Sequence, residues 1–124
     1  MNIVDSSGWL EYFADGENAS FFAPIIEDTG RLIVPMICMY EVFKRLVAQR
    51  GENTALVHIG DMHHGQVADL TASIALQAAK ISTELKMAMA DSIILATARA
   101  YQATLWTQDA DFAGIDGVKY NEKK

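Results

Sequence analysis

The sequence predicts an α/β fold, in which one domain over residues 1–124 has a mostly parallel central sheet of about four to five short strands with helices on both faces. Short apolar runs alternate with longer segments at helical spacing, an order typical of parallel strands joined by helical crossovers. With 124 residues, 51% of them hydrophobic, the chain can bury one core and is too short for two. It has 8 Gly, 2 Pro and no single-residue tract, which excludes a disordered or low-complexity chain.

The first third of the chain predicts a strand, two helices and a second strand. The run Ile3-Val4 ends at Asp5, and the aromatic residues that follow recur at i, i+3 and i+4, on one face of a helix. Thr29-Gly30 is a helix stop, and Pro35 closes the next apolar run. The expected elements are a strand at 3–4, helices at 9–13 and 19–27, and a strand at 31–34.

The rest of the chain predicts four helices and three strands. The longest helix has no Gly or Pro and ends at Gly51, and the most Ala-rich segment has its larger apolar residues at helical spacing. The expected helices are at 36–50, 53–62, 71–85 and 91–101, with a turn at 63–65, and the expected strands are at 66–70, 104–107 and 118–120.

Charge and cysteine content exclude several classes of protein. The net charge is −6, and the first 30 residues contain six acids and no Lys or Arg, unlike a generic nucleic-acid binder. A polyanionic substrate would therefore need clustered cations or bound metal ions. The single cysteine, Cys38, cannot form an internal disulfide, and no signal peptide or run of about 20 apolar residues is found. We expect a cytoplasmic protein without a membrane segment.

Four acids are candidates for a functional site, two because they directly follow predicted strands and two because a charge is unfavourable in their apolar surroundings. Asp5 and Asp109 directly follow predicted strands, and such sheets bind ligands beyond the carboxyl ends of their strands. Glu41 and Asp91 lie in otherwise apolar helical segments, where an unpaired carboxylate costs several kcal/mol.

Carboxylates gathered at one place require a cation. Two carboxylates about 4 Å apart repel by about 4 kcal/mol at an effective dielectric constant near 20. Oxygen ligands without Cys or His favour Mg²⁺ or Mn²⁺ over Zn²⁺. The alternative interpretation is that Asp91 only caps its helix and Glu41 faces solvent beside Lys44 or Arg45. Spacing alone leaves both interpretations open.

Four segments together match the pattern of a known family: Val4-Asp5-Ser6-Ser7, Tyr40-Glu41-Val42, Ala90-Asp91-Ser92-Ile93-Ile94-Leu95-Ala96-Thr97-Ala98 and Leu105-Trp106-Thr107-Gln108-Asp109-Ala110-Asp111-Phe112. In these segments the chain resembles the PIN-domain ribonucleases, and among them the small VapC-type toxins of prokaryotic toxin–antitoxin pairs. The resemblance covers essentially the whole chain. The segments containing Asp91 and Asp109, 18 residues apart, are the most specific.

The resemblance implies a single PIN-like domain that hydrolyses RNA with an acidic Mg²⁺ or Mn²⁺ cluster. The family's catalytic, metal-binding acids fall on Asp5, Glu41, Asp91 and Asp109. Asp111 corresponds to an acid that either supports the metal or holds a turn. Ser7 and Thr107 match positions with hydroxyls near the metal or phosphate, and helix capping and core hydrogen bonding are equally open for them.

The resemblance gives less guidance on how RNA is held. The candidate phosphate contacts are Lys44 and Arg45, with Arg50 further along their helix, and Lys86 and Arg99, which flank the helix of Asp91. Each could equally be a solvated surface charge. Gln108 departs from the family, since a basic residue is common there.

VapC-type toxins pair with an antitoxin and commonly form homodimers, so the resemblance implies both partners here. We expect a cognate antitoxin near the helix that carries Trp9, Tyr12 and Phe13, with Phe21 and Phe22 on the same surface. The alternative is that these aromatic residues are only core. None of the histidines at 58, 63 and 64 is expected to be a metal ligand, and the adjacent pair at 63 and 64 is expected to be exposed.

The function expected from the sequence is therefore a metal-dependent endoribonuclease, the toxin of a type II toxin–antitoxin system. The alternative is a non-catalytic PIN-like module that binds RNA or protein. Two further alternatives are a nuclease acting on DNA or another phosphoester and an unrelated phospho-acceptor domain. The last would need a strand-end Lys, which the sequence lacks.

Overall fold

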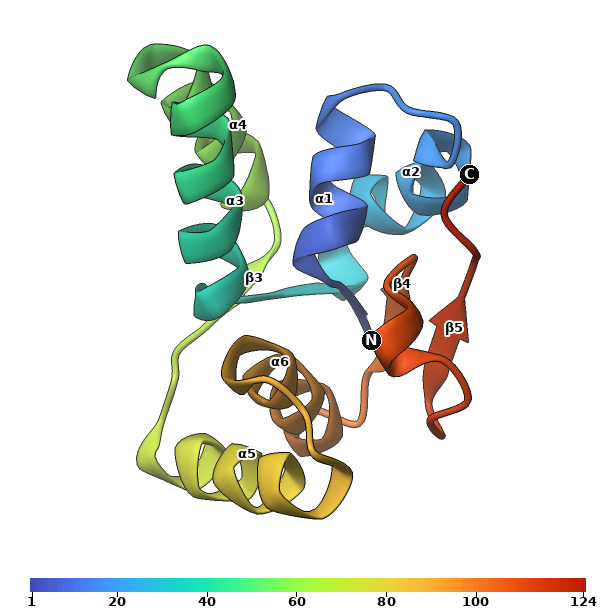
Figure 1. Cartoon of the computed structure of the whole chain (residues 1–124). Helices are drawn as coiled ribbons and strands as arrows, with labels where there is room; N and C mark the ends of the chain where they lie inside the picture. Colours follow the sequence, from blue (N-terminus) through green and yellow to red (C-terminus); the bar gives the residue numbers. More distant parts are fainter.

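A five-stranded sheet lies at the centre of the computed structural model, which describes residues 1–124 (Figure 1). All four strand pairings are parallel, in the order β3-β2-β1-β4-β5, so the predicted parallel α/β sheet is confirmed. The strands are β1 (Asn2–Val4), β2 (Leu32–Pro35), β3 (Gln66–Ala68), β4 (Thr104–Thr107) and β5 (Val118–Tyr120).

Six α-helices connect and cover the strands. In Figure 1, α1 and α2 lie on one side of the sheet, α5 and α6 lie on the other, and α3 with α4 forms a helical hairpin beside α1. None of the helices is both long enough and apolar enough to span a lipid bilayer. The helices are α1 (Ser6–Phe13), α2 (Ala19–Glu27), α3 (Met36–Arg50), α4 (Glu52–Met62), α5 (Ala72–Leu85) and α6 (Met89–Ala100), and two 3₁₀ turns are η1 (Thr29–Arg31) and η2 (Ala110–Phe112).

Every predicted element is present, and the differences lie at element ends. The first helix begins at Ser6 rather than residue 9, because the Asp5 carboxylate accepts a hydrogen bond from the Gly8 N–H and caps the helix. The strand predicted at 66–70 ends at Ala68, because Leu70 is exposed and Thr71 caps the next helix. Local caps therefore set boundaries that hydrophobic periodicity alone does not fix.

Helix α6 is the most deeply buried helix. Every residue from Ser92 to Ala98 is buried, since the sheet packs on one side of the helix and α5 on the other. The small side chains of Ala96 and Ala98 allow this close packing. The core also encloses Trp9 and Phe22, both fully buried, so the prediction that these two side chains form a partner-binding surface is wrong. They belong to the core, which was the alternative interpretation.

The strand order reverses direction at β1. The chain moves outward from β1 through β2 to β3, and then crosses to the other side of β1 to form β4 and β5. Ligands of open parallel sheets bind at this kind of switch point, beyond the carboxyl ends of the two central strands. Asp5 follows β1 and Asp109 follows β4, so both acids lie at the switch point.

Gly8 lets α1 start close to the sheet. A Cβ atom at this position would lie 2.5 Å from Val4 Cγ1 and 2.7 Å from Phe22 Cε1, distances that require the neighbours to move. The close approach brings the N-terminus of α1 directly over the end of β1. The Asp5 carboxylate can therefore cap the helix from the position that ends the strand.

Candidate metal centre

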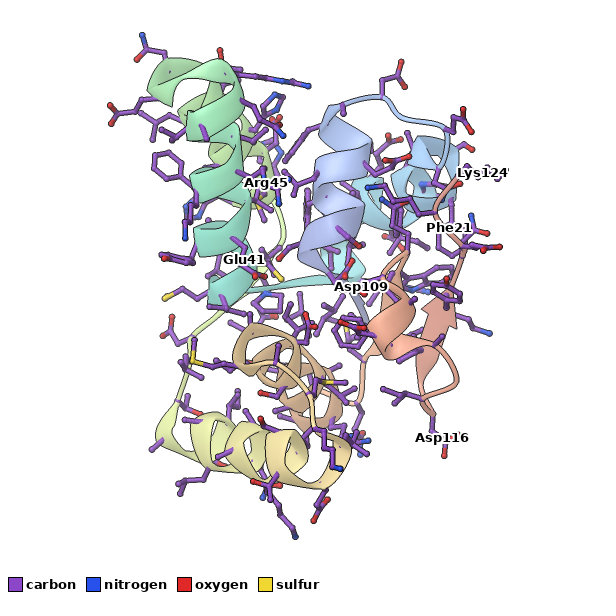
Figure 2. The ribbon with its side chains drawn as sticks, viewed as in Figure 1. Phe21, Glu41, Arg45, Asp109, Asp116 and Lys124 are labelled. Carbon is purple, nitrogen blue, oxygen red and sulfur yellow. The ribbon has the colours of Figure 1, made fainter.

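The four acids predicted from the sequence line one cavity of about 500 Å³, hereafter the acidic cavity. Its walls come from the N-terminus of α1, from α3, from the first turn of α6 and from the loop after β4. Figure 2 shows Glu41 on α3 and Asp109 after β4 on either side of it. The cavity is lined by Asp5, Glu41, Asp91 and Asp109, together with Ser6, Ser7, Leu10, Tyr40, Lys44, Arg45, Ala48 and Ile94.

Asp5 is the most buried of the acids, with 2% of its surface exposed. Its carboxylate accepts hydrogen bonds from the Ser7 hydroxyl at 2.8 Å, the Thr107 hydroxyl at 2.8 Å and the Gly8 N–H at 3.0 Å. Burial raises the pKa of Asp5 to about 6, and these three donors counteract part of that effect because they favour the ionised form.

Ser7 and Thr107 act on the acids rather than facing solvent. The Thr107 hydroxyl donates to Asp5 Oδ2 and accepts a 2.9 Å hydrogen bond from the Asp109 N–H. One fully buried hydroxyl therefore joins the acid after β1 to the acid after β4. Ser7 fixes the Asp5 carboxylate from the other side, and both residues are positioning residues for Asp5.

Asp91, Asp109 and Asp111 come closest together. Each offers a carboxylate oxygen, and the three oxygens lie within 4.8 Å of one another. The N-cap of α6 is Ala88, so Asp91 does not cap this helix and the alternative interpretation of Asp91 is wrong. Burial, and then repulsion from Asp109 and Glu41, raises the pKa of Asp91 to about 7. Asp111 stands at the exposed edge, and its N–H also donates to Asp109 Oδ1 at 2.9 Å.

Glu41 forms the opposite wall, on α3. It is half-buried, and its Oε1 accepts a 2.6 Å hydrogen bond from the Ser6 hydroxyl. The only salt bridge in the structure joins His58 to Asp61, so Glu41 forms none with Lys44 or Arg45, although all three line the acidic cavity. Repulsion from Glu41 contributes to the raised pKa of Asp91, which places the two carboxylates in one electrostatic environment.

The donor set fits a hard divalent cation. All the candidate ligands are carboxylate oxygens. A bound cation would relieve the repulsion between carboxylates that contributes to the raised pKa of Asp91. Neither a Cys nor a His lines the acidic cavity, so the donors of a typical zinc site are absent from its lining. Asp5, Glu41, Asp91, Asp109 and Asp111 are the residues that could hold Mg²⁺ or Mn²⁺ here.

The role of the Thr107 hydroxyl gives a first prediction. Thr107→Val keeps the shape of the side chain but removes one donor from Asp5 and the acceptor of the Asp109 N–H. We expect a loss of about 1–3 kcal/mol in the free energy of unfolding and about tenfold weaker Mn²⁺ binding. Chemical denaturation and titration calorimetry measure the two effects. Thr107→Ser, which keeps the hydroxyl, is the control, and equal Mn²⁺ affinity of the Val and Ser variants would contradict the prediction.

Comparison with known proteins assigns the family. The PIN-domain family model matches residues 3–118, which is nearly the whole chain. The chain belongs to the PIN-domain family. The resemblance noted in the sequence is thereby confirmed at the level of the family, while the comparison with curated proteins finds no significant match.

Solved structures share the fold of this PIN domain at low sequence identity. A toxin–antitoxin complex from Klebsiella pneumoniae matches with a TM-score of 0.81 and 23% identity, covering 99% of this chain and 100% of that chain. VapC20 of Mycobacterium tuberculosis, described as a sarcin-ricin loop cleaving toxin, matches with a TM-score of 0.75 and 17% identity, covering 94% and 95%. DNA-bound VapBC of Salmonella typhimurium matches with a TM-score of 0.75 and 17% identity, covering 98% of each chain.

The structure separates the predicted phosphate contacts of this PIN domain into two groups. Lys44 and Arg45 line the acidic cavity, one turn beyond Glu41 on α3. Lys86 and Arg99 do not line it, and Arg99 lines a different hollow between α5 and α6. Arg99 lies eight residues along α6 from Asp91, about 12 Å away along the helix axis, and its contact with phosphate stays a prediction, as does that of Lys86.

Gln108 does not replace a basic residue on the surface of this PIN domain. Its side chain is 5% exposed, and its Oε1 accepts a 3.0 Å hydrogen bond from Asn18 Nδ2. Its Nε2 donates to Glu11 Oε1 at 3.4 Å. The residue is structural, since it ties the loop after β4 to α1 and to the start of α2.

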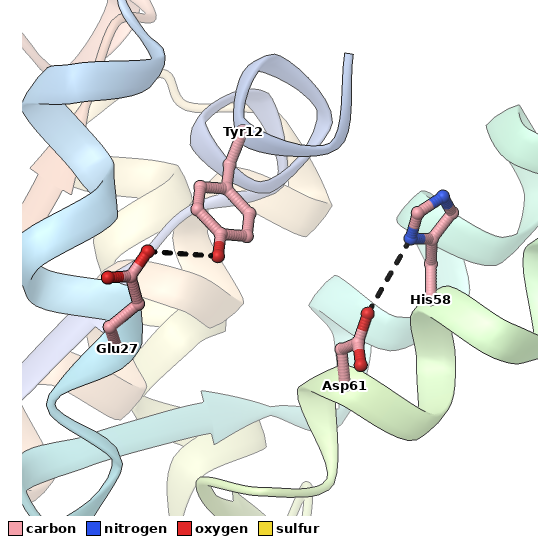
Figure 3. Close-up of polar contacts among 4 residues, drawn as sticks. All are labelled: Tyr12, Glu27, His58 and Asp61. Carbon is pink, nitrogen blue, oxygen red and sulfur yellow. Dashed lines mark hydrogen bonds and ion pairs between the residues drawn. The ribbon is translucent and has the colours of Figure 1, made fainter. Parts of the chain in front are cut away.

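The outer face of α1 is tied to its neighbours by side chains shown in Figure 3. The Tyr12 hydroxyl donates to Glu27 on α2 at 3.2 Å, and His58 on α4 lies 3.7 Å from Asp61. The Phe13 and His58 rings stack with centroids 4.2 Å apart. His58 is therefore half-buried, whereas the histidines at 63 and 64 are exposed, as predicted. None of the three histidines lines the acidic cavity.

Two polar residues of the acidic cavity were not assigned a role from the sequence. Ser6 holds Glu41, and Tyr40 lines the cavity with 61% of its surface exposed. Both lie in the segments that carry the family resemblance. The sequence shows only that each is a polar residue next to an acid. The partner of Ser6 is 35 residues away in the chain, so spacing cannot reveal it.

Proposed function

We propose that this PIN domain is a metal-dependent endoribonuclease that acts in the cytoplasm as the toxin of a type II toxin–antitoxin system. The observation that carries the proposal is the acidic cavity, where four acids from four separate segments meet at the switch point of a parallel sheet. The raised pKa of Asp91 supports it, because gathering these charges without a cation is unfavourable.

The similar structures support the toxin part of the proposal. One is described as a toxin–antitoxin complex, two as VapBC bound to DNA, and one as a toxin that cleaves the sarcin-ricin loop. Their identities to this chain are 13–23%, so they support the activity only together with the acidic cavity. We propose that this chain likewise hydrolyses phosphodiester bonds, with RNA as the substrate.

The residues of the cavity have distinct proposed roles. Asp5, Glu41, Asp91 and Asp109 hold Mg²⁺ or Mn²⁺, and Asp111 completes the group at its exposed edge. A bound ion would polarise the phosphate and activate a water molecule. Ser7 and Thr107 keep the Asp5 carboxylate in place, and Ser6 does the same for Glu41. Lys44 and Arg45 supply local positive charge, which a chain of net charge −6 needs in order to attract RNA.

The proposed partners are a cognate antitoxin and a second copy of the chain. Tyr12, Phe13 and Phe21 are half-buried at the surface of α1 and α2, while Trp9 and Phe22 are inside the core. Contact of the antitoxin near the helix of Tyr12 and Phe13 stays a prediction, as does the homodimer.

The proposal is tested by incubating a mixed RNA pool with purified, antitoxin-free protein in Mn²⁺, Mg²⁺ or EDTA. We expect cuts with either metal, none in EDTA and none after the antitoxin is added. Mapped ends should carry 5′-phosphate and 3′-hydroxyl groups. Asp91→Asn prepared in parallel controls for contaminating nucleases. Binding of RNA without cuts in any metal would overturn the nuclease and favour the non-catalytic RNA-binding module.

A further inference from the structure

A second hollow lies directly beside the acidic cavity. It has a volume of about 370 Å³ and shares two lining residues, Ser7 and Asp109, with the acidic cavity. Its outer wall is the end of β5 and the segment that follows, which contribute Tyr120, Glu122 and Lys123. We call this space the C-terminal hollow. In Figure 2, Asp109 lies between Glu41 on one side and the segment ending at Lys124 on the other.

The wall of the C-terminal hollow is held by buried polar contacts. The Asn121 N–H donates to the Thr107 carbonyl at 3.0 Å, which continues the pairing of β5 with β4. Asn18, 2% exposed, donates from Nδ2 to the Glu122 carbonyl at 3.0 Å and to Gln108 Oε1 at 3.0 Å. The backbone of the segment is therefore held at Asn121 and Glu122, beside the loop that carries Asp109.

The far side of the acidic cavity has a similar pair of residues. Tyr40 on α3 is 61% exposed and lines the cavity, and Lys44 Nζ lies 5.9 Å from the centroid of its ring. Tyr120 is 36% exposed at the other end. An exposed tyrosine with a lysine nearby thus stands on each side of the acids, and the tyrosine rings have no role in the metal centre.

Aromatic rings beside cations are how proteins bind single-stranded nucleic acid, since bases stack on the rings and the cations contact the phosphates. We propose that one RNA strand crosses the acidic centre from Tyr40 and Lys44 to Tyr120 and Lys123, with a base stacked on each tyrosine. The inference rests on the proposed function and adds the path of the strand and the two tyrosines that hold its bases. A duplex does not fit this arrangement, because its bases are already stacked on one another.

The charges of the two hollows agree with this path. Of the 10 Lys and Arg residues in the chain, Lys44 and Arg45 line the acidic cavity and Lys123 lines the C-terminal hollow. Glu122 also lines the C-terminal hollow, and the other acids along this line are the proposed metal ligands. A strand laid along this line therefore meets a cation before and after the point of cleavage.

The experiment measures RNA binding separately from cleavage. The parent is the Asp91→Asn protein, and the probe is a fluorescein-labelled single-stranded RNA of about ten nucleotides, followed by fluorescence anisotropy. We expect Tyr120→Ala to weaken binding by about fivefold to a hundredfold, and Tyr120→Phe to bind within about twofold of the parent. Tyr101, also 36% exposed but at the end of α6, is the matched control, and Tyr101→Ala should bind like the parent.

Salt dependence tests the lysine. Lys123→Ala should reduce the slope of log affinity against log salt by about 0.7, the contribution of one phosphate contact to a single strand. Lys80, exposed on α5, is the matched control, and Lys80→Ala should leave the slope unchanged. Tyr40→Ala provides a second variant at the other end of the path, so that the test does not depend on the folding of one protein.

The outcomes separate this inference from the proposed function. Parent-like affinity of the Tyr120→Ala and Tyr40→Ala proteins would overturn the path even if the unsubstituted protein cuts RNA. Equal affinity for a duplex of the same sequence would overturn the stacking of bases on the tyrosines. Weakened binding in these variants supports the path, and if the unsubstituted protein then shows no metal-dependent cuts, only the nuclease function fails. A parent that binds no RNA would overturn the path, while cleavage by the unsubstituted protein tests the nuclease function separately.

Discussion

Asp91→Asn is expected to lower the rate of metal-dependent RNA cleavage by about two orders of magnitude or more. Asp91 lies in the group of three closest carboxylates, and repulsion from the neighbouring acids contributes to its raised pKa. Asparagine has nearly the same size and removes one negative charge from the proposed ligand set. Cleavage of an RNA pool in Mn²⁺, followed with enzyme in excess over RNA, measures the effect on the chemical step.

Matched variants show whether the loss is specific to the acidic cavity. Asp5→Asn should be as inactive as Asp91→Asn, and Asp111→Asn should lose less, because Asp111 stands at the exposed edge of the group. Asp116, exposed in the loop before β5 (Figure 2), is the control, and Asp116→Asn should keep full activity. Pure Asp91→Asn protein that cuts at the parent rate would exclude these acids from the reaction.

The inactive variant should remain folded. Burial and repulsion both oppose the ionised form of Asp91, so replacing it with a neutral side chain removes an unfavourable charge from the metal-free protein. We therefore expect Asp91→Asn to unfold at a higher temperature than the unsubstituted protein at neutral pH without metal. Loss of activity together with higher stability is the combination that structural damage cannot produce.

The fold and the four acids could be predicted from the sequence because both depend on local patterns. Asp5 and Asp109 directly follow strands, and strand ends on either side of a switch point must meet. Glu41 and Asp91 stood out as acids in apolar helical segments. Each of these inferences needs only a few neighbouring residues, together with the general rules of parallel α/β sheets.

The misplaced residues depend on contacts between distant segments. Helical spacing puts Trp9 and Phe13 on similar faces of α1, but it does not say that Trp9 is completely buried while the half-buried Phe13 stacks on His58. Gln108 looked like a surface position until Asn18, 90 residues away, gave it a buried partner. The C-terminal hollow was invisible for the same reason, since its wall is fixed by Asn18, 104 residues from Glu122.

The stability of the metal-free protein is expected to fall as pH rises. The pKa of Asp5 is raised from 3.8 to about 6 and that of Asp91 from 3.8 to about 7 in the folded protein. A carboxyl whose pKa is higher in the folded state binds its proton more tightly there, so its contribution to stability is complete below pH 3.8 and is lost as pH rises through the folded pKa. Thermal unfolding in EDTA should therefore give a lower Tm at pH 8 than at pH 5.

Divalent metal should reverse this trend, because the ionised carboxylates that destabilise the metal-free protein are its proposed ligands. Mn²⁺ at about 100 times its Kd would stabilise the fold by about 2.7 kcal/mol, which raises Tm on the order of 10 °C. The rise should be large at pH 8 and small at pH 5, where protons compete with the ion. Asp91→Asn should show both a flatter pH profile in EDTA and a smaller response to Mn²⁺. A response to Mn²⁺ that is equal at the two pH values, or equal in the variant, would place the ion outside the acidic cavity.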